Sequence, residues 1–134
     1  MAIVARSMGK RSKYGNKKVT AGGITFDSRI EQVRYLELML AERTGLIVNL
    51  EVHPKFDIFI NGKKICAYVG DFMYLTPLRK MVPDGTSVDV VWVDGKGFER
   101  IVEDVKSRAT MTPVYRIKKK LMAATHGIIV KEIM

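Results

Sequence analysis

The chain has only one cysteine and no long hydrophobic run. Cys66 alone cannot form an intrachain disulfide or a cysteine-ligated zinc cluster, so a reducing cytoplasm is the expected compartment. No apolar stretch approaches the ~20 residues that a membrane-spanning helix needs. Residues 1–5 are too short and wrongly flanked for a signal peptide. The sequence therefore predicts a cytoplasmic protein that makes no use of a membrane.

Acidic residues are scarce relative to basic ones. Fourteen Asp and Glu against 23 Lys and Arg give a formal net charge of +9, an imbalance that favours polyanionic partners through counterion release. Nucleic acid is the first candidate partner, ahead of an anionic membrane surface. The length of 134 residues and the 47% hydrophobic composition suit one folded domain.

Acids are absent from the first twenty residues, which carry six Lys and Arg interrupted by glycines. Such a segment can neither bury a face nor keep a helical period. We predict a flexible basic arm over residues 1–20 and a single domain over residues 21–134. The arm either follows a nucleic-acid backbone or only keeps the protein in solution.

A helix should begin after Ser28, because Ser28 and Glu31 form a capping box behind the apolar Phe26. The helix should end near Gly45. Capping explains Glu31 locally, and it is compatible with a catalytic role for the same side chain. The residues at helical spacing that we expect to be buried are Ile30, Val33, Leu36 and Leu40.

Strand-like patterns follow from residue 50. Segments 51–60 and 63–75 are joined by Asn61-Gly62, which predicts a type I′ hairpin turn. Asp71 is the only charged residue in an uncharged run of the second segment. A carboxylate there is costly unless it is paired or binds a cation. Alternatively, Asp71 faces water at a strand edge, beside a bulge at Gly70.

Further strands are expected at residues 88–93 and 98–106, after a loop over 76–87. Alternation places Asp104 and Lys106 on the same face of the last strand. This pair could hold a divalent cation and present an ammonium group beside it, or it could be a solvated ion pair at a strand end. Asp89 rivals Asp71 as the acid on the neighbouring strand.

A second helix should open at Thr112-Pro113 and end at Gly127, with no acid along it. Its cations could bind phosphates or form a solvated face. A closing strand is expected at residues 128–133. The expected buried residues are Val114, Ile117, Leu121 and Ala124, and the candidate phosphate-binding residues are Tyr115, Arg116, Lys118, Lys119 and Lys120.

The two histidines and the single tryptophan have local explanations. His53 starts a strand before Pro54, and His126 ends a helix; neither has a ligand-like neighbour in the sequence. Trp92 and Tyr115 could stack on bases, but their apolar surroundings favour a place in the core.

The order of helix, antiparallel strands, helix and strand, with acids at Glu31, Asp71 and Asp104 and a lysine at Lys106, resembles the PD-(D/E)XK nuclease superfamily. More specifically, the chain looks like a family of small phage and prophage proteins, itself remotely similar to the phage junction-resolving endonuclease I group. The stretches that carry this resemblance in the first half are Lys13-Tyr14-Gly15-Asn16-Lys17-Lys18, Phe26-Asp27-Ser28 with Glu31, and Leu50-Glu51 to Pro54-Lys55-Phe56. Those in the second half are Tyr68-Val69-Gly70-Asp71-Phe72, Val102-Glu103-Asp104-Val105-Lys106, and Thr112-Pro113-Val114-Tyr115-Arg116 to Lys120.

The resemblance implies an α/β (α+β) fold with a PD-(D/E)XK nuclease-like core, in which helices flank a mixed, mostly antiparallel sheet. It implies Mg²⁺ or Mn²⁺ held by Asp71, Asp104, the carbonyl of Val105 and Glu31, with Lys106 acting on the attacking water or the scissile phosphate. The residues that would bind DNA are Lys13, Lys17, Lys18, Tyr115, Arg116, Lys118, Lys119 and Lys120.

The activity implied is Mg²⁺-dependent hydrolysis of branched DNA of the Holliday junction type by a homodimer, in the cytoplasm of an infected or lysogenic host. A flap, single-strand or nicking nuclease and a non-catalytic DNA-binding module of phage recombination or packaging are the alternatives. Three departures from the superfamily pattern are present, and the one at Gly70 and Ser107 puts little in doubt. The segment 77–93 is longer than usual, which keeps Asp89 in consideration, and the superfamily more often has Glu two residues before the lysine. Glu103 falls on the opposite face, so we prefer Asp104.

Overall fold

The computed structural model describes residues 19–21, 23–78 and 90–134. The predicted contacts of Lys13, Lys17 and Lys18 with DNA, and the rival acid Asp89, lie outside these residues. The predicted arm ended at residue 20, but β1 (Val19–Ala21) already pairs with β2 (Ile24–Phe26).

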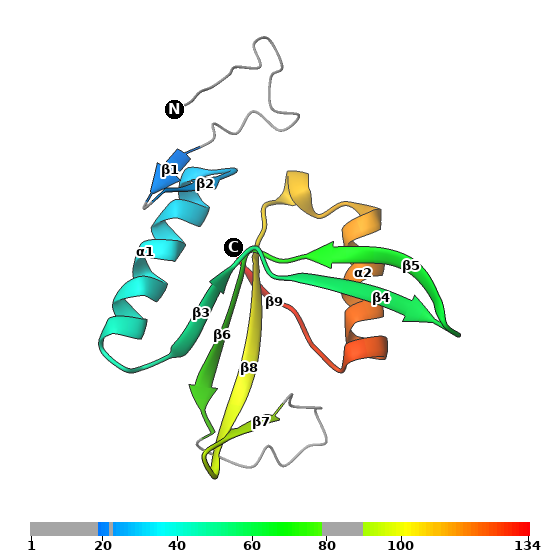
Figure 1. Ribbon diagram of the computed structural model, residues 1–134. Coiled ribbons are helices and arrows are strands. Elements are labelled where there is room, and N and C mark those ends of the chain that lie inside the picture. The colour runs from blue at the N-terminus through cyan, green and yellow to red at the C-terminus, as the bar shows by residue number, and fades with distance from the viewer. Residues whose placement is uncertain (1–18, 22, 79–89) are drawn as a thin grey trace.

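The fold is mixed α+β, with a mostly antiparallel sheet and two helices, which confirms the coarse fold class (Figure 1). Four antiparallel strands lie in the order β3-β6-β8-β7, and β9 pairs with β8 in parallel. A short 3-10 helix, Arg108–Thr110, follows β8. The elements of this sheet are β3 (Val48–Val52), β6 (Phe72–Pro77), β7 (Val90–Val93), β8 (Lys96–Val105) and β9 (Lys131–Ile133).

The hairpin predicted at Asn61-Gly62 is confirmed, with both turn residues at positive φ. Its strands, β4 (Lys55–Ile60) and β5 (Lys63–Val69), form a separate two-stranded sheet. The two long strands that we predicted are therefore each broken, between β3 and β4 and between β5 and β6. At the break, the Gly70 N–H donates to the Pro54 carbonyl (3.0 Å) and the His53 N–H donates to the Asp71 carbonyl (2.9 Å). The breaks leave Asp71 beside the end of β8 rather than inside a continuous strand.

The two helices, α1 (Arg29–Arg43) and α2 (Pro113–His126), lie on opposite sides of the central sheet (Figure 1). Two buried clusters correspond to these two sides. The α1 side contains Phe26, Tyr35, Leu38, Ile47, Phe72 and Tyr74, and the α2 side contains Ile58, Tyr68, Val102, Tyr115, Met122, Ile128 and Val130.

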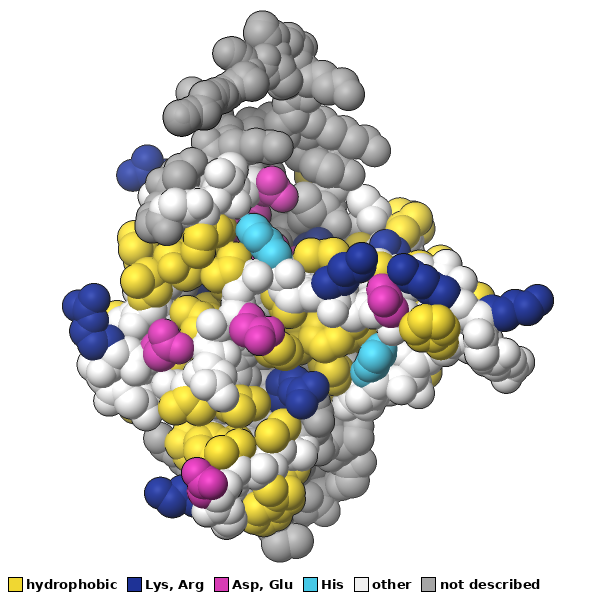
Figure 2. All heavy atoms as spheres, in the orientation of Figure 1, with side chains coloured by type: hydrophobic (Ala, Val, Ile, Leu, Met, Phe, Trp, Pro, Cys, Tyr) yellow, Lys and Arg dark blue, Asp and Glu magenta, His cyan; other side chains and the backbone are white. Residues whose placement is uncertain are grey.

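The predicted buried stripe of α1 was wrong. Ile30, Val33, Leu36 and Leu40 are each 50–60% exposed, and Figure 2 shows hydrophobic side chains gathered at the surface over α1. The buried face instead consists of Glu31, Tyr35 and Leu38. The physical reason is that polar side chains near the start of α1 determine which face meets the sheet: Glu31 is buried, and Arg34 binds Glu103.

The stripe predicted for α2 was also largely wrong. Val114, Ile117 and Ala124 are exposed, Leu121 is half-buried, and Tyr115 and Met122 are the buried residues. Trp92 was also expected in the core, but it is 69% exposed on β7. Within the described ranges, neither helix combines the length and hydrophobicity that crossing a bilayer would require.

Candidate metal centre

The candidate site is built on the junction of β6 and β8. Asp71 comes immediately before β6, and its Oδ2 accepts a hydrogen bond from the Val105 N–H at 2.6 Å. The Asp71 N–H in turn donates to the carbonyl of Glu103 (3.0 Å). These two contacts fix Asp71 against the end of β8, where Asp104 and Lys106 lie.

Asp104 is 4% exposed and shares a hydrogen bond with the Asp71 side chain. Its Oδ2 accepts from the Tyr68 hydroxyl at 2.5 Å, and its Oδ1 lies 3.2 Å from the Lys106 ammonium. Burial and the charge of Asp104 raise the pKa of Tyr68, so this hydroxyl stays protonated and remains a donor. The Asp104–Lys106 pair is thus buried, unlike the solvated pair considered from the sequence.

Glu31 reaches the same pocket from the first turn of α1. The Glu31 N–H donates to Ser28 Oγ (3.2 Å), which confirms Ser28 as the N-cap. The carboxyl group is 6% exposed, and its Oε1 has no hydrogen-bond partner within the described part of the chain. A buried oxygen without a partner is costly in a folded protein, which indicates that a group outside the described residues or a bound ligand satisfies it.

The three carboxyl groups repel one another as anions. Burial raises the pKa of Asp71 to about 9, and the charges of Asp104 and Glu31 add to the shift. Burial, with Asp27 and Asp104, also raises the pKa of Glu31. Without a cation, Asp71 therefore retains its proton at neutral pH. The buried Glu31 and Asp104, the half-buried Asp71 and one lysine form a donor set that fits a divalent cation preferring oxygen ligands.

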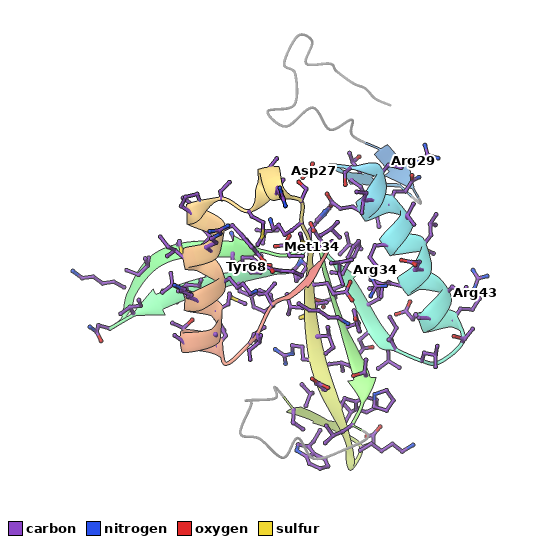
Figure 3. The ribbon with its side chains drawn as sticks, turned by 180° about the vertical axis from the view of Figure 1, so that it is seen from behind. Asp27, Arg29, Arg34, Arg43, Tyr68 and Met134 are labelled. Carbon is purple, nitrogen blue, oxygen red and sulfur yellow. The ribbon has the colours of Figure 1, made fainter. Side chains whose placement is uncertain are left out.

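Glu103 points away from this pocket, as alternation predicted. It is fully buried, and Arg34 of α1 binds both of its oxygens, Nε to Oε1 at 2.8 Å and Nη2 to Oε2 at 2.6 Å. The Tyr74 hydroxyl also donates to Glu103. Figure 3 shows Arg34 on the α1 side of the sheet and Tyr68 on the α2 side. Glu103 therefore anchors α1, and Arg34 is an important residue that the sequence analysis missed.

His53 is a second residue that the sequence analysis missed. One ligand atom each from Glu31, His53 and Asp71 lies within 4.8 Å of the others. The sequence offered no signal for this arrangement, because His53 lies 22 positions after Glu31 and 18 positions before Asp71. Only the break between β3 and β4 brings the imidazole to the two acids.

Tyr115 lies beneath Lys106, with the ammonium 4.0 Å from the ring centroid. The Tyr115 hydroxyl donates to Glu132 Oε2 at 2.9 Å, and the Tyr115 residue is 7% exposed. Burial leaves little of the ring for a base to stack on, and the ring face holds the Lys106 ammonium. The contact of Tyr115 with DNA stays a prediction. The expected place of Tyr115 in the core is confirmed.

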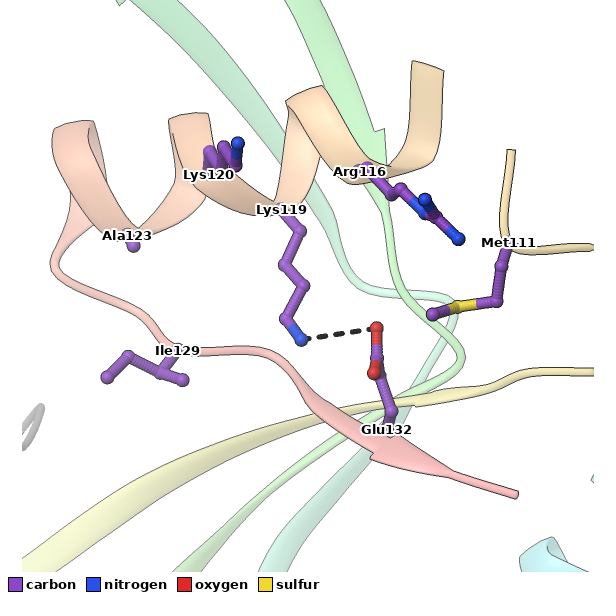
Figure 4. Close-up of a pocket in the computed structure, with 7 residues that line it drawn as sticks. All are labelled: Met111, Arg116, Lys119, Lys120, Ala123, Ile129 and Glu132. Atoms are coloured by element: carbon purple, nitrogen blue, oxygen red, sulfur yellow. Dashed lines mark ion pairs between the residues drawn. The ribbon is translucent and has the colours of Figure 1, made fainter. Parts of the chain in front are cut away.

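The cations of α2 surround a cavity of about 370 Å³ (Figure 4). Arg116, Lys119 and Lys120 line it, together with Met111, Ala123, Ile129 and Glu132. Lys119 forms an ion pair with Glu132 at 3.1 Å. Lys118, the remaining α2 cation among the predicted phosphate-binding residues, is half-buried and does not line this cavity. Glu132 connects the two regions, since it also binds Tyr115 under Lys106.

We expect the stability of the protein to fall as pH rises from about 4 to about 9. Asp71 has a pKa of 3.8 when unfolded and about 9 when folded, so between these values the folded state binds the extra proton and stability is lost as pH rises. At a fixed concentration equal to 100 times its Kd at high pH, a divalent cation should add about 2.7 kcal/mol, or roughly 10 °C in Tm, and it should add less at lower pH, where the proton on Asp71 competes with it.

Thermal unfolding with EDTA and with Ca²⁺ across this pH range measures both effects. Asp71→Asn imitates the protonated acid and should flatten the pH dependence. A variant that keeps the wild-type slope would contradict the assignment of the raised pKa to Asp71.

The chain was compared with protein families, curated proteins and solved structures. A family model described as "Protein of unknown function (DUF1064)" matches residues 11–131. Neither a curated protein nor a solved structure matches the chain.

Proposed function

We propose that this chain, which belongs to the DUF1064 family, is a divalent-metal-dependent endodeoxyribonuclease with its site at Glu31, Asp71, Asp104 and Lys106. The observation that carries the proposal is the hydrogen bond between Asp71 and the buried Asp104, with Lys106 paired to Asp104 at 3.2 Å. The resemblance to the PD-(D/E)XK superfamily noted in the sequence supports the same reaction.

Mg²⁺ or Mn²⁺ would be held by Asp71 and Asp104, with Glu31 and the Val105 carbonyl as the other protein donors. The unsatisfied Glu31 Oε1 and the raised pKa of Asp71 both support this assignment, because cation binding would relieve each of them. When bound, a divalent ion supplies a more acidic water and a counter-charge for the phosphate in the transition state.

Lys106 stabilises the negative charge that builds on the scissile phosphate or orients the attacking water. Its ammonium is fixed from two sides, by Asp104 and by the face of Tyr115, so it loses little freedom when the substrate binds. Tyr68 holds the Asp104 carboxylate in place through the second oxygen. Hydrolysis then proceeds in line, without a covalent enzyme intermediate.

The DNA backbone would lie along the cations of α2. Arg116, Lys119 and Lys120 converge on one cavity, and Glu132 joins that cavity to Tyr115 and Lys106. Such contacts position a duplex without reading its sequence. Exposed Trp92 is a further surface on which a base could stack, now that its place in the core is excluded.

Incubation with supercoiled plasmid and with four-way and flap DNA, with and without Mg²⁺, tests the activity. We expect Mg²⁺-dependent cuts, with branched DNA preferred over linear duplex. Cutting of flaps or single strands alone would show that the substrate is not branched junction DNA. Binding of DNA without any cut in Mg²⁺ or Mn²⁺ would refute the nuclease and favour a DNA-binding module. Cytoplasmic location in a phage-infected or lysogenic host belongs to the same proposal.

Resolving a junction requires two coordinated cuts, so we also propose a homodimer. The exposed α1 stripe of Ile30, Val33, Leu36 and Leu40 is the surface expected to pack against its own copy. Leu36→Glu should convert a dimer of about twice 15.1 kDa into a monomer, measured by sedimentation velocity. Ile65→Glu, at an equally exposed site on β5, should remain dimeric. A wild-type monomer that resolves junctions would contradict the proposal.

A further inference from the structure

His53 has no part in the nuclease machinery proposed above, yet its side chain lies beside that machinery. One ligand atom each from Glu31, His53 and Asp71 lies within 4.8 Å of the others. Two ligands of the same cation can be no more than about 4.4 Å apart when each bond is about 2.2 Å. Small side-chain movements would therefore be enough to bring all three onto one ion.

The backbone holds His53 in an uncommon conformation. Its φ is 55°, in the left-handed region that non-glycine residues seldom adopt, and a proline follows it. The His53 N–H donates to the Asp71 carbonyl at 2.9 Å. The centroid of the His53 ring lies 6.1 Å from the ring centroid of the fully buried Phe26. Residues kept in such conformations cluster at functional sites, where the surrounding structure offsets a cost of ~1–3 kcal/mol.

Glu31 supplies an independent indication of a ligand. It is 6% exposed, and one of its oxygens, Oε1, has no partner among the described residues. Ser28 contacts only the other oxygen, Oε2, at 3.5 Å. The free oxygen thus belongs to the same side chain that joins His53 and Asp71 in the cluster.

We propose that Glu31, His53 and Asp71 form a second cation site next to Asp104, with Asp71 and Glu31 shared between the two sites, and that the imidazole makes this second site select Mn²⁺ over Mg²⁺. Mg²⁺ prefers oxygen ligands and retained waters, whereas imidazole suits first-row transition ions. The inference rests on the proposed function only in treating the acidic pocket as a cation site. It adds a ligand and a metal preference that the three acids alone do not provide.

Pulsed electron paramagnetic resonance of Mn²⁺ bound to the full chain tests this directly, because a coordinated imidazole nitrogen modulates the manganese spin echo. The chain has only two histidines. His53→Asn removes the imidazole, while asparagine tolerates the left-handed backbone. His126→Asn is the matched control, since His126 lies against Phe56 and the Asp57 carbonyl.

We expect nitrogen modulation in the wild type and in His126→Asn, and none in His53→Asn. Mn²⁺ affinity by calorimetry should fall at least ~10-fold in His53→Asn, with Mg²⁺ affinity near wild type. Modulation that is missing from the wild type, or that persists in His53→Asn, would overturn the proposal, as would an equal loss of both metals. The outcome is separate from cleavage: a nuclease without nitrogen modulation refutes only this site, and modulation without any cutting refutes only the nuclease.

Discussion

Asp104→Asn and Lys106→Ala should each lower Mg²⁺-dependent cleavage of branched DNA by about a thousandfold or more, with DNA binding in Ca²⁺ near wild type. Asp104 contributes a buried charged oxygen that faces Asp71 and Lys106. Asparagine keeps the shape of the side chain but removes this charge. Neither residue lines the cavity of α2, so most phosphate contacts should survive in both variants.

The two substitutions should differ in how they affect cation binding. Asp104→Asn removes a ligand and should weaken Mn²⁺ binding measured by calorimetry. Lys106→Ala removes a positive charge 3.2 Å from Asp104, so cation binding should persist or strengthen while cleavage is lost. This difference separates the role of the carboxylate from that of the ammonium group.

The β4–β5 hairpin offers a matched control. Asp57 and Lys64 also form an ion pair at 3.2 Å, but both side chains are nearly half exposed. Asp57→Asn and Lys64→Ala change the same chemical groups outside the pocket, and cleavage should stay near wild type. Full cutting by either pocket variant, or equal loss in the control variants, would remove Asp104 and Lys106 from the mechanism.

Local signals in the sequence were sufficient for several features. The Asn61-Gly62 turn and the Ser28 cap depend on residues adjacent in the chain, and both are confirmed. Strand alternation separated Asp104 from Glu103 correctly, because period two fixes the face of every residue in a regular strand. The same alternation kept Lys106 with Asp104.

Features that depend on contacts between distant parts of the chain could not be predicted from such local signals. The apolar period of α1 identified a real stripe but assigned it to the wrong face, since Arg34 orients the helix through its contact with Glu103, far along the chain. The breaks at His53 and Gly70 come from hydrogen bonds between two segments, so neither segment reveals them alone. The proximity of His53 to Asp71 follows from those breaks.

Arg34→Ala should destabilise the fold by about 3–5 kcal/mol, because it leaves the Glu103 carboxylate buried without its cation. Glu103 is 0% exposed and receives two hydrogen bonds from Arg34, at 2.8 and 2.6 Å. Only the Tyr74 hydroxyl would remain as a side-chain partner within the described structure. The loss corresponds to a fall of roughly 10–20 °C in Tm, which thermal or urea unfolding would measure. Arg43→Ala, exposed in the last turn of the same helix, should change stability by less than about 0.5 kcal/mol.

The effect of Arg34 should extend to the metal centre, because Glu31 lies three residues before Arg34 on α1. Once α1 loses its contact with Glu103, that contact no longer holds the helix, and the position of Glu31 in the pocket is less well fixed. Mn²⁺ affinity should therefore fall in Arg34→Ala under conditions where the variant is still folded. The double variant Arg34→Met/Glu103→Leu removes both charges and should recover a large part of the lost stability, since no unpaired carboxylate remains. If the double variant is as unstable as Arg34→Ala, the cost lies in packing rather than in the orphaned charge, and the electrostatic account of how α1 is anchored fails.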